Sequence, residues 1–189
     1  MSADAIYQVT RALRLRLEQV AGNGKVFVGP LDDPDAGSAS LVLFLYRIMP
    51  NASLRNREHR VPSNTSPPVV VFNNSLPLDL YYLVTVGTTP GNNEEQLLKV
   101  LGSTMQALQL NSELMGPDLS YEAVHVSLEP LTTEETGRIW TLFPTANYRT
   151  SIAYLASPVW IDPQQPATAA ALVVKDSLDV GAGATLIME

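Results

Sequence analysis

The segment ANYRTSIAYLASPVWIDP, residues 146–163, says most about how this chain folds. Side chains alternate in character from Thr150 to Leu155, and a period of two predicts a strand. The pair Tyr148–Arg149 precedes this strand, and a Ser-Pro-Val step follows it at residues 157–159. The segment carries no arrangement of catalytic groups, so it indicates a structural element of the fold.

Further strands are predicted along the chain. The run from Ser40 to Met49 is almost continuously apolar, which is typical of a strand covered on both faces. Residues alternate from Leu78 to Val86 and again from Val124 to Leu128. A short strand is predicted at residues 25–28, and a last one at residues 172–180.

Three helices separate these strands. The first is predicted from apolar residues at steps of three and four, and it ends at Gly22-Asn23-Gly24; its stripe is Ile6, Val9, Leu13, Leu17 and Val20. The second begins with Asn92 or Asn93 as its cap; its predicted buried stripe is Leu97, Leu98, Leu101, Met105 and Leu108. The third, a short one, runs from the Thr132-Thr133-Glu134-Glu135 start to about Trp140.

Strands alternating with helices predict an α+β fold, a mixed or antiparallel sheet with helices packed on one face. We expect one domain over residues 1–165, followed by a C-terminal tail at 166–189. The stretch from Pro50 to Pro68 is rich in Asn, Ser, Arg and Pro, which predicts a long exposed loop or a hairpin extension.

The composition excludes several classes of protein. The chain has 189 residues and a net charge of −7, and it lacks the basic footprint of a nucleic-acid binder. It has no cysteine, which excludes disulfides, thiolate zinc sites and a cysteine nucleophile. The run from Leu41 to Tyr46 is too short to cross a bilayer, and the N-terminus shows no secretory signal. We therefore expect no direct membrane insertion, and folding and assembly in a cytoplasm.

No motif in the sequence predicts a cofactor or a reaction. The run Gly22-Asn23-Gly24-Lys25 lacks the glycine spacing of a phosphate loop, and Val26 follows the lysine where such a loop has Ser or Thr. His59 lies in the basic loop and His125 on a predicted strand, where it is partly buried or faces a neighbouring subunit. Neither has a nearby cysteine or histidine to complete a metal site. We predict no enzymatic activity, no metal and no cofactor.

Three arginines stand out in this acidic chain: Arg55, Arg57 and Arg60. One interpretation is a solvated loop. The other is a docking patch, because a guanidinium group pairs with a carboxylate through two parallel hydrogen bonds. Two aromatic residues flank the 150–155 strand, Tyr148 and Trp160; Trp160 either belongs to the core or anchors a contact between subunits.

The Tyr148–Arg149 pair, the alternating strand and the Ser-Pro-Val step together resemble the cap, or tail-terminator, proteins of extracellular contractile injection systems. This resemblance implies a homo-oligomer, expected to be a hexameric ring, which binds the distal end of the inner tube and sheath and stops their growth. It also implies that Tyr148 and Arg149 contact partner subunits or proteins, together with the loop that carries Arg55, Arg57 and Arg60. The particle would be assembled in the cytoplasm and then released or attached to a membrane.

The tail offers a further partner contact. Leu172, Val173 and Val174 form an extended, apolar, uncharged run that suits strand addition to a neighbour. An alternative from another class also stays open at this point: a soluble ligand-binding domain or enzyme whose site lies outside recognised motifs.

Overall fold

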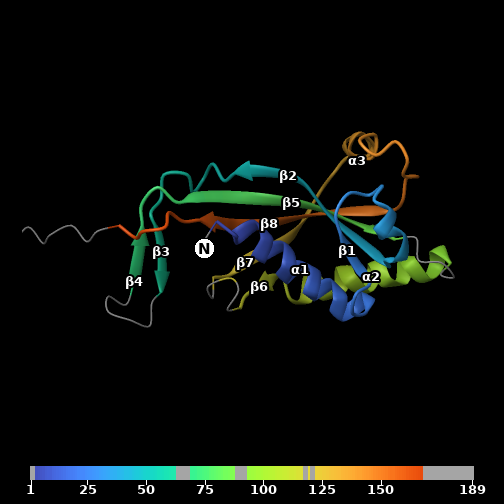
Figure 1. The fold of residues 1–189 in the computed structure, drawn as a ribbon, viewed down its shortest axis with the longest axis horizontal. Helices are drawn as coiled ribbons and strands as arrows, with labels where there is room; N and C mark the ends of the chain where they lie inside the picture. The colour runs from blue at the N-terminus through green and yellow to red at the C-terminus, as the bar shows by residue number, and fades with distance from the viewer. Residues whose placement is uncertain (1–2, 63–68, 88–92, 117–118, 120–121, 168–189) are drawn as a thin grey trace, which may run out of the picture.

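The computed structural model describes residues 3–62, 69–87, 93–116, 119 and 122–167 (Figure 1). The elements in chain order are α1 (Ala5–Ala21), β1 (Val26–Val28), the 3₁₀ helix η1 (Pro34–Ser38), β2 (Leu41–Pro50), β3 (His59–Pro62), β4 (Val69–Phe72), β5 (Leu76–Val86), α2 (Glu94–Leu110), β6 (Glu113–Leu114), β7 (Val124–Glu129), α3 (Thr133–Trp140) and β8 (Ser151–Ile161).

Six strands form one mixed sheet in the order β1-β2-β5-β8-β7-β6, while β3 and β4 form a separate two-stranded sheet. β1 runs parallel to β2, and the other neighbouring pairs of the large sheet are antiparallel. The long strands β2, β5 and β8 lie at the centre and extend along the molecule (Figure 1). The predicted α+β fold with a mixed or antiparallel sheet is confirmed, and the sheet is of the mixed kind.

Strand β8 is longer than predicted, because it continues past Leu155 to Ile161. It contains a β-bulge against β5: Ser157 and Pro158 together lie opposite the single residue Asp79. A bulge leaves one residue unpaired in the ladder, and it therefore accommodates a proline, which has no backbone N–H. The Ser-Pro-Val step is thus part of the central strand.

The sheet separates two groups of buried side chains. Helices α1 and α2 cover one face, where the larger core includes Val9, Leu13, Leu101, Leu108, Tyr82, Val84 and Tyr154. The short helix α3 lies at one end of the opposite face (Figure 1), over a smaller core that includes Val42, Leu83, Ala153, Trp140 and Phe143. Both long helices therefore share one face as predicted, and α3 covers part of the other.

Local signals in the sequence set the helix ends. α1 ends at Ala21, and Gly22 follows it with a φ of 99° while its N–H donates to Glu18 O at 2.9 Å. α2 begins after Asn93, whose side chain accepts a hydrogen bond from Gln96 N at 2.9 Å. None of the helices in the described part of the chain combines the length and hydropathy of a membrane span.

The buried stripe of α2 differs from the predicted one. Leu97, Leu101 and Leu108 are buried as predicted. Leu98, predicted to be buried, is 43% exposed, and Thr104, which was not part of the predicted stripe, is fully buried. The hydroxyl of Thr104 satisfies its hydrogen bond within the helix by donating to the carbonyl four residues earlier, at 2.8 Å. A polar residue that bonds its own helix in this way can lie on a buried face.

The arginine-rich stretch after β2 forms a hairpin extension, which was one of the two predicted alternatives. A turn over residues 51–58 leads into β3, and β3 pairs with β4 in an antiparallel register that places His59 opposite Phe72. The β3–β4 hairpin stands at one end of the long sheet, at the opposite end from α3 (Figure 1).

Candidate functional site

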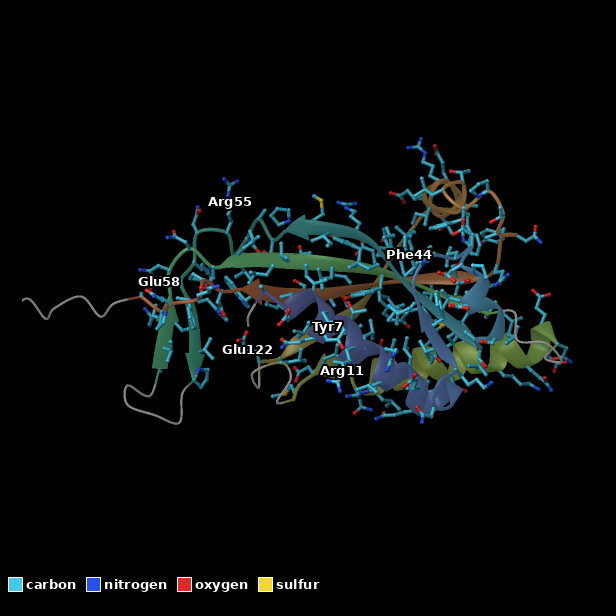
Figure 2. All side chains as sticks on the ribbon, in the orientation of Figure 1. Tyr7, Arg11, Phe44, Arg55, Glu58 and Glu122 are labelled. Atoms are coloured by element: carbon cyan, nitrogen blue, oxygen red, sulfur yellow. The ribbon has the colours of Figure 1, made fainter. Side chains whose placement is uncertain are left out.

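The candidate site is the region where the β3–β4 hairpin joins the main sheet. A groove of about 480 Å³ lies here between the 55–58 turn and the 73–75 turn. Its lining residues are Arg55, Asn56, Arg57, Glu58, Asn73, Asn74 and Ser75. Figure 2 shows Arg55 pointing outward from this end of the molecule, with Glu58 beside the hairpin. We call this feature the arginine groove.

The turn that carries Arg55 and Arg57 is anchored by Asn51. The side-chain oxygen of Asn51 accepts hydrogen bonds from the N–H groups of Ser53 and Leu54, both at 3.1 Å. Its amide nitrogen donates to Asp79 Oδ1 at 2.9 Å, at the bulge described above. Asparagine side chains commonly close turns in this way. The groove is therefore tied to the central strands through one polar side chain.

A cluster of one histidine and two carboxylates, shielded from solvent, adjoins the groove. His59 is 7% exposed, although it follows the exposed Glu58 in the chain. Its Nδ1 atom lies 2.7 Å from Asp162 Oδ1, and its Nε2 atom lies 3.1 Å from Glu122 Oε2. We call these three residues the His59 triad. Glu122 comes from the segment before β7, His59 from β3 and Asp162 from the chain just after β8.

Two further contacts hold the triad in place. The hydroxyl of Ser75, which lines the groove, donates to Asp162 Oδ1 at 2.6 Å. The indole of Trp160 stacks on the imidazole of His59, with ring centroids 4.4 Å apart and planes 9° from parallel. Ser75 therefore links the groove to the triad through one hydrogen bond.

The electrostatics of the triad favour a charged imidazole. Burial lowers the pKa of His59, but the hydrogen bonds to Glu122 and Asp162 outweigh this effect and leave its pKa raised. The three side chains offer ligand atoms within 4.8 Å of one another. The two carboxylates, however, bind opposite nitrogens of the same ring, so the three groups do not converge on one point as metal ligands do.

The predicted site residues do not all meet. Arg55 and Arg57 line the groove, whereas Arg60 lies on β3 and pairs with Glu58 at 3.0 Å. Trp160 is 8% exposed and stacks within the chain, a placement that favours the core alternative over a subunit anchor.

The Tyr148–Arg149 pair lies just before the first residue of β8, at the end of the sheet near α3. Tyr148 is 65% exposed and its ring lies 5.4 Å from that of Trp140, while burial lowers the pKa of Arg149. The predicted partner contacts of Leu172, Val173 and Val174 lie outside the described residues.

His59 lies elsewhere than predicted, whereas His125 lies on its predicted strand. His59 was expected in an exposed basic loop, and it is instead buried at the start of β3. His125 was expected to be partly buried or to face a neighbour; in this chain it is an exposed residue of β7. One signal could have identified the site of His59: Trp160 and Asp162 are two positions apart, so on an extended chain they face the same side.

Comparisons with known proteins agree with this architecture. The family model described as the Pvc16 N-terminal domain matches residues 8–175. No curated protein matches the chain by sequence.

Two solved structures share the fold. One is the PVC sheath/tube terminator in the extended state, from an extracellular contractile injection system: TM-score 0.65, 19% identity, covering 96% of this chain and 65% of that one. The other is the tube-terminating cap of the anti-feeding prophage: TM-score 0.65, 21% identity, covering 91% and 60%. This chain therefore spans less than two thirds of the length of each.

Proposed function

The chain belongs to the Pvc16 N-terminal domain family, and from that premise we propose that it is a structural cap of a contractile injection system. In this role it binds the distal end of the inner tube and sheath and stops their polymerisation. The observation that carries the proposal is the family match over residues 8–175, together with a fold shared with two terminators of such particles.

Capping of this kind needs surfaces and no chemical step. A tube grows because each layer presents a surface that fits the next layer. A closed ring that binds this surface on one face and offers a different surface on the other ends the growth. We propose a hexameric ring, in which six moderate contacts act together and bind far more tightly than one. This role favours a protein without enzymatic activity over the alternative of a ligand-binding domain or enzyme.

We place the contact to tube or sheath at the arginine groove. Arg55 and Arg57 are exposed and their side chains line a polar groove that Asn51 holds in place. Guanidinium groups on a constrained turn suit pairing with carboxylates of a partner. Arg60, already paired with Glu58, would add charge to the same end of the molecule. Tyr148 and Arg149 remain candidates for contacts between subunits, whereas the buried Trp160 packs within the chain.

The tail is a second proposed contact. The N–H of Ala167 donates to Val71 O at 2.8 Å, so the last described residue of the chain lies along the outer edge of β4. From this point the apolar run Leu172–Val174 would add a strand to a neighbouring subunit. A truncation after Ala167 keeps the hydrogen bond to Val71 and removes the run. We expect that truncated chain to fold normally and to lose ring formation or sheath capture.

The decisive experiment compares particles made with and without this chain. Tube and sheath proteins are produced in a strain that lacks the chain, and then in the same strain supplied with it. Electron microscopy measures the length distribution and the distal ends. We expect long, variable particles without the chain and uniform particles with closed ends when it is present. Unchanged lengths and intact ends in its absence would rule the capping role out.

A further inference from the structure

The His59 triad presents a chemical constraint that does not depend on the capping role. Carboxylate oxygens accept hydrogen bonds and do not donate them. Both ring nitrogens of His59 face carboxylate oxygens, at 2.7 Å from Asp162 and 3.1 Å from Glu122. A neutral imidazole has one N–H and would leave one nitrogen lone pair against a carboxylate. The geometry therefore requires a proton on each nitrogen while both carboxylates are ionised.

The partners of the triad come from separate parts of the chain. His59 belongs to β3 of the hairpin, Glu122 to the segment that leads into β7, and Asp162 to the chain just after β8. The side chains of the triad are 4% to 11% exposed. A charged group in such a buried position is stable only when it is paired, and loss of one partner is costly.

We infer that His59 is a positioning residue: its imidazolium ion fastens the β3–β4 hairpin to the main sheet, and loss of its proton loosens the hairpin and the arginine groove above it. Three further side chains surround the His59 triad. Ser75 donates to Asp162, the indole of Trp160 covers one side of the imidazole, and the ring of Phe72 lies 6.4 Å from it. The adjacent charges in β3 and its preceding turn, Glu58 and Arg60, are exposed and pair with each other.

Loss of the proton affects the hairpin more than the rest of the fold. The large sheet is held by long ladders and by two apolar cores. The hairpin has two strands of four residues each, and a two-stranded sheet alone is marginally stable in water. Its attachment through the triad is therefore the contact whose loss changes its mobility most. Glu58 and Ser75 line the groove and border the triad, so the groove moves with the hairpin.

The direct test is a nuclear magnetic resonance titration of the imidazole signals in the isolated full-length chain. The chain has two histidines, so the variant His125→Gln leaves His59 alone and assigns its signals. We expect both nitrogens of His59 to carry protons at pH 7, with a titration midpoint above the ordinary value of about 6.5. A midpoint at or below that value, or a neutral His59 tautomer at pH 6, overturns the inference. This test needs no substitution of His59 itself.

The second measurement follows the hairpin by amide hydrogen exchange between pH 6 and pH 9, corrected for the intrinsic pH dependence of exchange. We expect the opening equilibrium of β3 and β4 to shift toward the open state as pH rises and His59 loses its proton. The total increase should be roughly tenfold for each unit by which the pKa of His59 in the folded chain exceeds its pKa in the unfolded chain. His59→Phe keeps a ring against Trp160 and removes both charged contacts, so its hairpin should open equally at every pH. Glu122→Gln should shift the midpoint downward.

An equal pH dependence of hairpin opening in the wild type and in His59→Phe contradicts the inference. The measurements use the isolated chain and no partner. A failed titration therefore leaves the capping proposal intact, and a failed capping experiment leaves the role of His59 intact.

Discussion

The indole ring of Trp160 lies flat on the imidazole ring of His59, with the two centroids 4.4 Å apart. This contact joins the end of the central strand β8 to the β3–β4 hairpin. A cation on an aromatic face gains roughly 0.5 to 2 kcal/mol, more when water is excluded. The contact therefore stabilises the charged form of His59 from a direction that neither carboxylate occupies.

Replacing Trp160 tests the packing part of this contact. Trp160→Ala removes a side chain that is 8% exposed, and we expect a loss of roughly 3 to 5 kcal/mol in the free energy of unfolding. Trp160→Phe keeps an aromatic face and should lose clearly less. Urea unfolding measures both. Equal losses for the two variants would show that stacking on His59 is unimportant.

The stability of the fold should depend on pH through the triad with a definite sign. The raised pKa of His59 means that its contribution is complete below the unfolded pKa, about 6.5, and disappears as pH rises through the folded pKa. For Asp162, burial raises the pKa, but hydrogen bonds that include those from Ser75 and His59 leave it lowered. Its contribution is therefore present above about 3.9 and disappears as pH falls through the folded pKa.

The measurement is the difference in unfolding free energy between the wild type and His59→Phe. We expect this difference to decrease steadily as pH rises from about 6.5 toward alkaline values. His125→Gln is the matched control, because His125 is an exposed histidine on β7. If the wild type instead becomes more stable relative to His59→Phe as pH rises, His59 does not carry a stabilising positive charge.

Gly87 is required by a close approach of two backbones. A Cβ atom at this position would lie 1.8 Å from the carbonyl oxygen of Ala39, and the N–H of Gly87 donates to Ser40 O at 2.8 Å. The carbonyl belongs to the backbone and cannot rotate away as a side chain does. We expect Gly87→Ala to lose about 1 to 3 kcal/mol or more in unfolding free energy.

A control for this variant lies in α2. A Cβ at Gly102 would meet nothing within 4 Å, so Gly102→Ala should stabilise the chain by roughly 0.5 to 1 kcal/mol through helix propensity. Opposite signs in the two variants, measured by urea unfolding, confirm the contact at Ala39. A neutral Gly87→Ala is incompatible with it.

Helix α3 begins with a reciprocal cap. Thr132 Oγ1 accepts from Glu135 N at 3.2 Å, and Thr132 N donates to Glu135 Oε2 at 2.9 Å. We expect Thr132→Ala to lose about 0.5 to 2 kcal/mol, while Thr132→Ser, which keeps the hydroxyl, stays close to the wild type. Thermal unfolding compares them. A Thr132→Ser variant as unstable as Thr132→Ala would mean that the hydroxyl is not the stabilising group.

The arginine groove predicts a charge effect on capping. Arg55→Glu with Arg57→Glu should leave the fold intact and lengthen particles toward those made without the chain, with an effect that weakens at high salt. The control Lys99→Glu with Arg138→Glu makes the same change in charge at side chains that are 74% and 77% exposed on α2 and α3. Particles lengthened equally by both pairs would point to net charge alone.

Several local features were readable from the sequence because neighbouring residues produce them. The Gly22 end of α1 and the Asn93 start of α2 arise from hydrogen bonds within four positions of the cap. Alternating side chains likewise predicted β5, β7 and the first part of β8, whereas β6 was not predicted. Periodicity misplaced Leu98, because a period of 3.6 marks a broad face and only packing against the sheet decides which edge of that face is buried.

By itself, then, the sequence determined the fold class, the helix ends and the central strands, since these follow from interactions between residues a few positions apart. The tertiary structure alone decided that His59 is buried and charged. Asp162 lies 103 positions from His59, and strand order and register bring the two together. The charge on an imidazole depends on which groups surround it in space, and no pattern of neighbours in the chain records that.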